Sequence, residues 1–443
     1  MKKRFAICSK IVLLLLLSAC GAPQTLDFSY APEGEELSSL MVETSQTHRA
    51  ELEHVPSAAD FADAISDDPA SAGLLSESEV ESLLRGHAAM ETVSKEQAQS
   101  DVSLLFRALQ SAYGAYEYFG QEKFDAAEDA VTQWLSSQDD EIKVSALGEK
   151  LQESLAFMLA HDAHAVIYEP AAEEIEAQVR YEYFFADGFY FSKDVNGSYY
   201  MVNDGERWTL SSFSNEHVSV QPTLLQDGRI VYQPTLFALR KDAVQSSVTL
   251  KNSSGKAKIY RLDWTESQPL DVDLGTLDYR LIQKDGLTYV SLRSFVSGTY
   301  DNMLARYARE GAKARGSKAV IYDLRGNVGG SDSWPRKWIQ SFLGTQNSIE
   351  TSMLYAQKNS ALFAAENSES LLPEDEGTCF AREVHGTWYE NDIPIIVLVD
   401  DHCGSSGEGA VQLLKTLDNV LIVGSNTAGY QLCGNISTFT LPY

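Results

Sequence analysis

The chain has 443 residues, 44 % of them hydrophobic, and a formal net charge of −28 at pH 7. That length is sufficient for two or three domains with large cores. The strong negative charge argues against nucleic acid or an anionic membrane surface as the binding partner.

The first stretch, MKKRFAICSKIVLLLLLSAC, has the features of a secretion signal. A basic start precedes an apolar run from Ile11 to Leu17 that is too short to span a bilayer as an ordinary helix. The letters LSAC resemble a bacterial lipobox, in which the cysteine is lipidated and becomes the new N-terminus. We therefore expect a lipoprotein signal peptide over residues 1–20 and an extracytoplasmic protein anchored to the membrane through Cys20. A plain signal peptide with a chance cysteine is the alternative.

Three segments of different composition follow the signal. Residues 21–95 are rich in Asp, Glu, Ser and Ala, which predicts an acidic disordered tether with short helices such as SESEVESLL. Residues 96–172 show apolar residues at helical spacing and predict a small helical domain. Residues 173–275 alternate aromatic and β-branched residues with polar ones between turn sequences, which predicts a β-rich module.

Strands and helices alternate in residues 276–443. Buried strands are expected at KAVIYDLRG, IPIIVLVDD and NVLIVGSN, and amphipathic helices at DNMLARYAREGAKARG and DSWPRKWIQSFLG. This order predicts an α/β layer with a largely parallel sheet, so the whole chain is an α/β (α+β) multidomain protein. Ligand-binding loops of such sheets lie at the carboxyl ends of the strands. Both glycine-rich loops of interest, after Asp323 and after Asp400, have that place.

Five cysteines are present. Cys8 leaves with the signal and Cys20 is assigned to lipid. Cys379, Cys403 and Cys433 remain in a compartment expected to be oxidising, and their odd number permits one disulfide and one free thiol, with the pairing open. The sequence has no CxxC or Cys/His cluster, which argues against a structural zinc site; no metal and no cofactor are implied.

The stretch HCGSSGEGA after a buried strand has two interpretations. Ser405 to Glu408 fits the capping box S-x-x-E, and the local pattern by itself favours that interpretation. Alternatively Ser405 is a nucleophile on a turn of small residues, with backbone N–H groups facing an oxyanion and a base from elsewhere. The loop VIYDLRGNVGGSD has no phosphate-binding fingerprint, and it is either a simple turn or a second source of N–H donors.

Together the two motifs resemble the catalytic core of the C-terminal-processing, or tail-specific, serine peptidases, from about residue 278 onward. The resemblance implies Ser405 as the nucleophile. It implies oxyanion donors at the N–H groups of Ser406 and of Gly329 or Gly330.

The Ser–Lys branch of that family carries a lysine where this chain has Tyr430. The tricorn-like branch uses a histidine at the end of the helical region, which corresponds to His164 in FMLAHDAHAVIYEP. An imidazole can accept the serine proton at neutral pH. His161 and His402 are the competing histidines. In that branch a glutamate orients the histidine, and we expect this third residue beyond Tyr443, so that residues 276–443 would be a truncated core.

The leading hypothesis is therefore a serine peptidase that cleaves extracytoplasmic polypeptides with Ser405 and His164. The alternative is an inactive peptide-binding lipoprotein of the same fold. A sugar- or nucleotide-binding α/β protein is a third hypothesis, supported only by the glycine loop. The β-rich module lies where the family often carries a PDZ-like domain, which makes C-terminal peptide recognition a further expectation.

Overall fold

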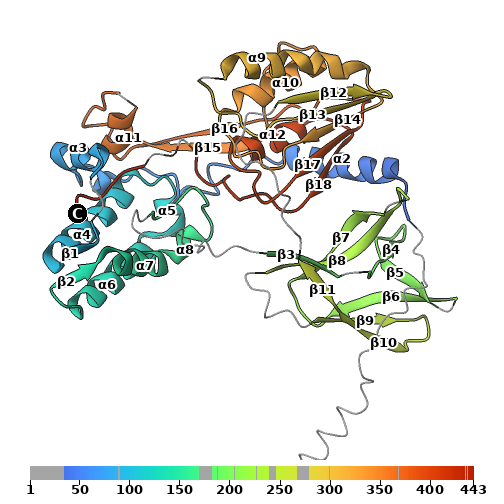
Figure 1. The fold of residues 1–443 in the computed structure, drawn as a ribbon, viewed down its shortest axis with the longest axis horizontal. Helices are drawn as coiled ribbons and strands as arrows, with labels where there is room; N and C mark the ends of the chain where they lie inside the picture. Colours follow the sequence, from blue (N-terminus) through green and yellow to red (C-terminus); the bar gives the residue numbers. More distant parts are fainter. Residues whose placement is uncertain are drawn as a thin grey trace, which may run out of the picture. The chain divides into compact units, whose positions relative to one another are not determined.

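The computed structural model describes residues 34–443 apart from residues 88–89, 169–181, 187, 204, 226, 239–245, 267–278, 299, 368, 435 and 437. Cys20 and the signal peptide predicted over residues 1–20 lie outside the described residues. The chain divides into two compact units (Figure 1). One consists of Met1–Glu43 and Val179–Pro269, and the other of Thr44–Gln178 and Leu270–Tyr443.

The first unit contains two antiparallel sheets, which agrees with the β-rich module predicted from the alternating pattern. Their orders are β10-β9-β6-β5-β4 and β11-β3-β8-β7. Trp208 and Val248 of one sheet share an apolar core with Phe184 and Tyr232 of the other. The strands are β3 Glu182–Ala186, β4 Ser192–Lys193, β5 Tyr199–Asn203, β6 Glu206–Phe213, β7 Val218–Leu224, β8 Ile230–Ala238, β9 Ser246–Lys251, β10 Ala257–Leu262 and β11 Trp264–Glu266. Because the two sheets share one apolar core, the described part of the module is a β-sandwich. The peptide recognition expected from its position stays a prediction.

Helices dominate the start of the second unit. They are α2 Leu37–Glu53, which begins in the first unit, α3 Glu77–Arg85, α4 Lys95–Ala112, α5 Tyr116–Phe119, α6 Gln121–Ser136, α7 Val144–Ser154 and α8 Ala156–Leu159. A short antiparallel pair, β1 Thr92–Ser94 with β2 Glu141–Lys143, joins them. Helices α4 to α8 enclose an apolar cluster around Phe124, Val131 and Leu151, which agrees with the helical domain predicted there.

The tether predicted over residues 21–95 differs from what its described part forms. Residues 37–53 and 77–85 are helical. Val80 and Leu83 of α3 are buried against Leu104 and Leu362, with Leu83 0 % exposed. The short helix expected at SESEVESLL is therefore formed as α3, but its apolar face packs into a core, while its acidic residues lie on the more exposed face.

The α/β layer is formed as the strand and helix alternation predicted (Figure 1). Its sheet has the order β12-β13-β14-β17-β18, parallel from β13 onward, with β12 antiparallel at one edge. The strands are β12 Arg280–Lys284, β13 Leu287–Ser291, β14 Ala319–Asp323, β17 Ile395–Val399 and β18 Val420–Gly424. Helices α9 Asp301–Glu310, α10 Ser333–Leu343 and α12 Ser406–Leu414 pack on the sheet through one apolar cluster that includes Tyr322, Trp338 and Leu414.

An insertion between α10 and β17 forms a separate ribbon. Strands β15 Met353–Lys358 and β16 Cys379–Val384 pair antiparallel, and α11 Ala361–Glu366 lies between them in sequence. Within the part of the chain that the structure describes, no helix has the length and apolar character of a membrane span.

Candidate active site

Three neighbouring parallel strands end at the same edge of the sheet. Asp323 ends β14, Val399 ends β17 and Gly424 ends β18. Because the strands are parallel, the segments that follow them lie together. We call these segments the glycine loop (326–331), the elbow (403–406) and the 428–433 segment.

Hydrogen bonds join the glycine loop to the elbow, and both follow strand ends as the sequence predicted. The Gly404 N–H donates to Asn327 O at 2.9 Å. The Ser406 hydroxyl donates to Gly330 O at 2.9 Å. Just before the elbow, Asp400 Oδ1 accepts the Gly326 N–H at 2.9 Å. These bonds fix the loop against the start of α12.

Asp323 anchors the base of the glycine loop. Its carboxylate is 0 % exposed and receives hydrogen bonds from Arg293, Arg325 and the Tyr289 hydroxyl. Burial by itself would raise the pKa of this carboxyl, but the two guanidinium groups and the hydroxyl hold that pKa well below its usual range. The group is therefore ionised at neutral pH and keeps both arginines beside the loop.

Ser405 has the backbone of a strained elbow. Its φ is 52° and its ψ is −122°, a conformation that side-chain-bearing residues rarely adopt and that clusters at functional sites. Its side chain makes no capping bond to α12. The capping box that the local pattern favoured is therefore not formed.

Another S-x-x-E sequence in the chain provides a direct contrast. Ser76 and Glu79 form a complete capping box at the start of α3, with Ser76 at φ −72°. Glu408, by contrast, directs its carboxylate to the N–H groups of Gly429 and Tyr430 at 2.7 and 2.8 Å. At the elbow, therefore, neither the Ser405 nor the Glu408 side chain takes part in a capping box.

Backbone N–H groups are available beside Ser405 for an oxyanion. In the described residues no acceptor binds the N–H of Ser406 or of Gly330, whereas the Gly329 N–H donates to Asn327 Oδ1 at 2.9 Å. Gly329 has φ 97°, and a Cβ there would lie 2.6 Å from Ser405 Cβ. Gly330 has φ 137°, and a Cβ there would lie 2.1 Å from the Phe295 carbonyl carbon. Both positions therefore require glycine, and only Gly330 has an N–H without an acceptor among the described residues.

His164 is held at two points. The backbone N–H of His164 donates to Asp162 Oδ1 at 3.0 Å, and the ring Nδ1 lies 2.6 Å from the carbonyl oxygen of Cys433. Because a carbonyl can only accept, Nδ1 must carry the proton, and the neutral ring then presents an unprotonated Nε2. The half-buried ring thus has the tautomer that a general base needs.

Asp162 supports the turn that carries His164. It is 1 % exposed and also accepts the Tyr113 hydroxyl at 2.8 Å. Burial, together with the negative charge of Asp162, raises the pKa of the Cys433 thiol to about 12. Cys433 therefore contributes a neutral side chain and its backbone carbonyl.

The 428–433 segment connects His164 with the elbow. The His164 and Tyr430 rings are 4.5 Å apart at 65°. The Tyr430 ring also lies against Gly404, where a Cβ would be 2.7 Å from the ring Cδ2. Ser405 Oγ makes no hydrogen bond to His164 among the described contacts. Catalytic hydrogen bonds are often long before substrate binds.

The two competing histidines, and the lysine nearest to the elbow in sequence, have other neighbours. His161 is exposed and lies near Phe119, with ring centroids 6.3 Å apart. His402 has its Nδ1 3.0 Å from Asp401. Lys415, at the end of α12, forms an ion pair with Glu51.

One group of side chains could offer metal ligands. Among the described residues, Asp400, Asp401 and His402 place one ligand atom each within 4.8 Å of one another. Asp400 Oδ1 is already bonded to the N–H groups of Gly326 and His402, so this carboxylate has a structural role in the elbow. The three described cysteines, Cys379, Cys403 and Cys433, are free thiols, so the disulfide that their number permitted is not formed.

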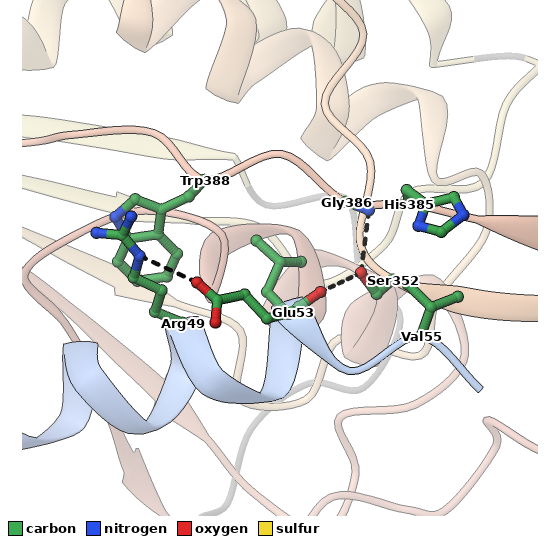
Figure 2. A pocket seen from close by; sticks show the side chains of 8 residues that line it. Arg49, Glu53, Val55, Ser352, His385, Gly386 and Trp388 are labelled. Carbon is green, nitrogen blue, oxygen red and sulfur yellow. Dashed lines mark hydrogen bonds and ion pairs between the residues drawn. The ribbon is translucent and has the colours of Figure 1, made fainter. Parts of the chain in front are cut away.

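A hollow of about 190 Å³ lies apart from these residues (Figure 2). Arg49 pairs with Glu53 at 3.5 Å and lies over the Trp388 ring. Ser352 accepts the Gly386 N–H at 3.0 Å and bonds to the end of α2. None of the site residues predicted from the sequence lines it.

A comparison with known families assigns most of the α/β layer to a protein family. Residues 286–440 match peptidase family S41. The chain contains an S41 peptidase domain. The match supports the assignment of the protein as a serine peptidase, which is a hydrolase. No curated protein matches the chain.

Solved structures similar to the chain have low sequence identity. A structure of mature CPAF complexed with lactacystin is 14 % identical with a TM-score of 0.36, covering 76 % of this chain and 85 % of that chain. The photosystem II D1 C-terminal processing protease is 14 % identical with a TM-score of 0.30, covering 74 % and 81 %. A lipoprotein from Streptococcus agalactiae is 13 % identical with a TM-score of 0.28, covering 78 % and 80 %.

Proposed function

We propose that the protein cleaves polypeptides with Ser405 of the S41 domain as nucleophile and His164 of the helical region as general base. The observation that carries the assignment is the backbone of Ser405, with φ 52° at the first turn of α12 and no capping bond. Such a turn projects a side chain at the end of a parallel strand. The Ser405 hydroxyl makes no capping bond that would offset the backbone strain, and such strain clusters at functional sites.

The chemical steps follow from the groups at hand. Ser405 Oγ attacks the peptide carbonyl carbon while Nε2 of His164 takes the hydroxyl proton. The N–H groups of Ser406 and Gly330 stabilise the oxyanion, at the start of α12 where the helix dipole also favours negative charge. The imidazolium then protonates the leaving amine, and water attacks the acyl-enzyme with the same histidine as base.

The polypeptide substrate is proposed to be extracytoplasmic, with the enzyme anchored through lipid on Cys20. The support is the basic and apolar start of the chain and its LSAC sequence. The high negative charge would otherwise keep the chain away from an anionic membrane surface, so a lipid anchor gives it a way to stay there. Radiolabelled fatty acid incorporated by the wild type and lost in Cys20→Ala would support this anchor.

A fluorophosphonate probe tests the nucleophile and the base separately. Ser405→Ala should abolish labelling and peptide cleavage. His164→Gln should slow labelling by about 10²- to 10⁴-fold, because the serine proton loses its acceptor. His161→Gln is the matched control, since this exposed histidine is three residues away, and it should label at the wild-type rate. Labelling of Ser405→Ala at the wild-type rate would reject the assignment.

A further inference from the structure

Glu408 occupies an unusual place for a residue on the first turn of a helix. It is 3 % exposed, and its two carboxylate oxygens accept two successive backbone N–H groups. Oε1 binds Gly429 at 2.7 Å and Oε2 binds Tyr430 at 2.8 Å. Hydrogen bonds to an ionised acceptor are roughly twice as strong as neutral ones, so this pair fixes the backbone it binds.

The backbone that Glu408 binds has no regular secondary structure. Besides the Glu408 bonds, it is tied to the elbow by the Ala428 N–H, which donates to Cys403 O at 2.9 Å, and by Gln431 Nε2, which donates to Ser405 O at 3.3 Å. Further along, the same segment supplies the Cys433 carbonyl that accepts from His164. The helix of the nucleophile and the ring of the base are therefore linked through Glu408.

We propose that Glu408 is a positioning residue of the active site. It fixes the 428–433 segment so that the Cys433 carbonyl holds His164 as the Nδ1–H tautomer and leaves Nε2 as the proton acceptor. The inference rests on the proposed function, because it assigns Glu408 a task only if His164 is the base. In this arrangement a backbone carbonyl performs the orienting task that a carboxylate has in a Ser–His–Asp triad.

The chemistry of the contact calls for a carboxylate. Two N–H donors point at one side chain, so both of its terminal atoms must be acceptors. Glutamine of the same shape offers one acceptor and turns an NH₂ group toward the other N–H. The segment would then shift to separate the two donors, and the His164 ring would lose its fixed acceptor.

The test substitutes Glu408→Gln in the full chain and measures two independent quantities. The first is kcat and KM for peptide hydrolysis, where we expect kcat to fall about 10- to 100-fold with KM nearly unchanged. The second is the tautomer of His164, from ¹H–¹⁵N spectra of the histidine rings assigned with His164→Gln. We expect the Nδ1–H form in the wild type and a mixture of tautomers in Glu408→Gln.

Glu310→Gln is the matched control. Glu310 is 9 % exposed, lies in the same domain and accepts from Tyr279 and Lys313, but it does not contact the 428–433 segment. This variant should keep the wild-type kcat and tautomer. An equal effect of both substitutions would mean a general loss of packing and would overturn the proposal.

Two further outcomes are decisive. A wild-type His164 that populates both tautomers, or a Glu408→Gln variant with an unchanged tautomer and kcat, overturns the proposal. If Glu408→Gln does not fold, amide hydrogen exchange of the wild type replaces this test. The Gly429 and Tyr430 amides, which Glu408 binds, should then exchange slowly, and rapid exchange would contradict the proposal. If the wild type hydrolyses no peptide, the proposed function fails, while the tautomer still decides whether Glu408 positions the ring.

Discussion

Replacing Ser405 with glycine should stabilise the protein while it removes the nucleophile. A residue with a Cβ held at φ 52° and ψ −122° carries roughly 1–3 kcal/mol of backbone strain. Glycine relieves that strain but adds about 0.4–1 kcal/mol of conformational freedom to the unfolded chain. The net expectation is a gain of about 1 kcal/mol in the free energy of unfolding.

Ser405→Ala is the comparison that isolates the strain. Alanine keeps the Cβ and therefore the strained backbone, and the serine hydroxyl it removes has no hydrogen-bond partner among the described residues. Ser405→Ala should thus unfold within about 0.5 kcal/mol of the wild type.

Differential scanning calorimetry can measure this difference. For a domain of this size, about 1 kcal/mol corresponds to roughly 2–4 °C in Tm. The transition assigned to the S41 domain in Ser405→Gly should therefore lie that far above the transition in Ser405→Ala. Equal or reversed melting temperatures would mean that the elbow is not strained, and the main argument for its catalytic role would be lost.

Two other substitutions test the loop and the helical core. Gly330→Ala should abolish probe labelling and lower Tm, because φ is 137° and a Cβ would lie 2.1 Å from the Phe295 carbonyl carbon; normal labelling would contradict the glycine-loop geometry. Asp101 is buried, and burial raises its pKa from 3.8 to about 6, although the hydrogen bond from the Tyr443 N–H and the nearby His87 oppose the shift. The folded protein therefore binds this proton more tightly than the unfolded chain, and the stability it contributes below pH 4 is lost as pH rises through about 6. Urea unfolding should show a loss of up to about 3 kcal/mol over that interval, absent in Asp101→Asn; parallel pH curves would refute the shift.

The α/β layer was the part of the fold most accessible from the sequence. Its strands are runs of buried β-branched residues bounded by glycine and aspartate, and the helices between them have clear apolar faces. The same reasoning placed the glycine loop and the elbow at the carboxyl ends of strands, and the structure adds that these two strands, β14 and β17, are neighbours. The acidic composition of residues 34–95, by contrast, led to the prediction of a tether, so α2 and the packing of the expected helix α3 into a core were missed.

Only part of the site could be predicted, because several of its features depend on backbone conformation and on backbone hydrogen-bonding groups and not on residue type. Ser76 and Ser405 stand in the same S-x-x-E pattern, and only the sign of φ separates a cap from an elbow. The acceptor for His164 is a backbone carbonyl, and because every residue has one, the sequence does not identify Cys433 as the partner. Glu408 was visible in the sequence, but its partners are N–H groups whose positions depend on the tertiary fold.

The separation of His164 from its acceptor has a consequence for biosynthesis. The two groups are 269 positions apart in the chain. At a translation rate of about 5–20 residues per second, a ribosome needs roughly 15–50 s to travel from one codon to the other. The histidine therefore leaves the ribosome long before its ring can be fixed. With His164 as the proposed base, a nascent chain would have no competent hydrolytic centre until Cys433 has been synthesised.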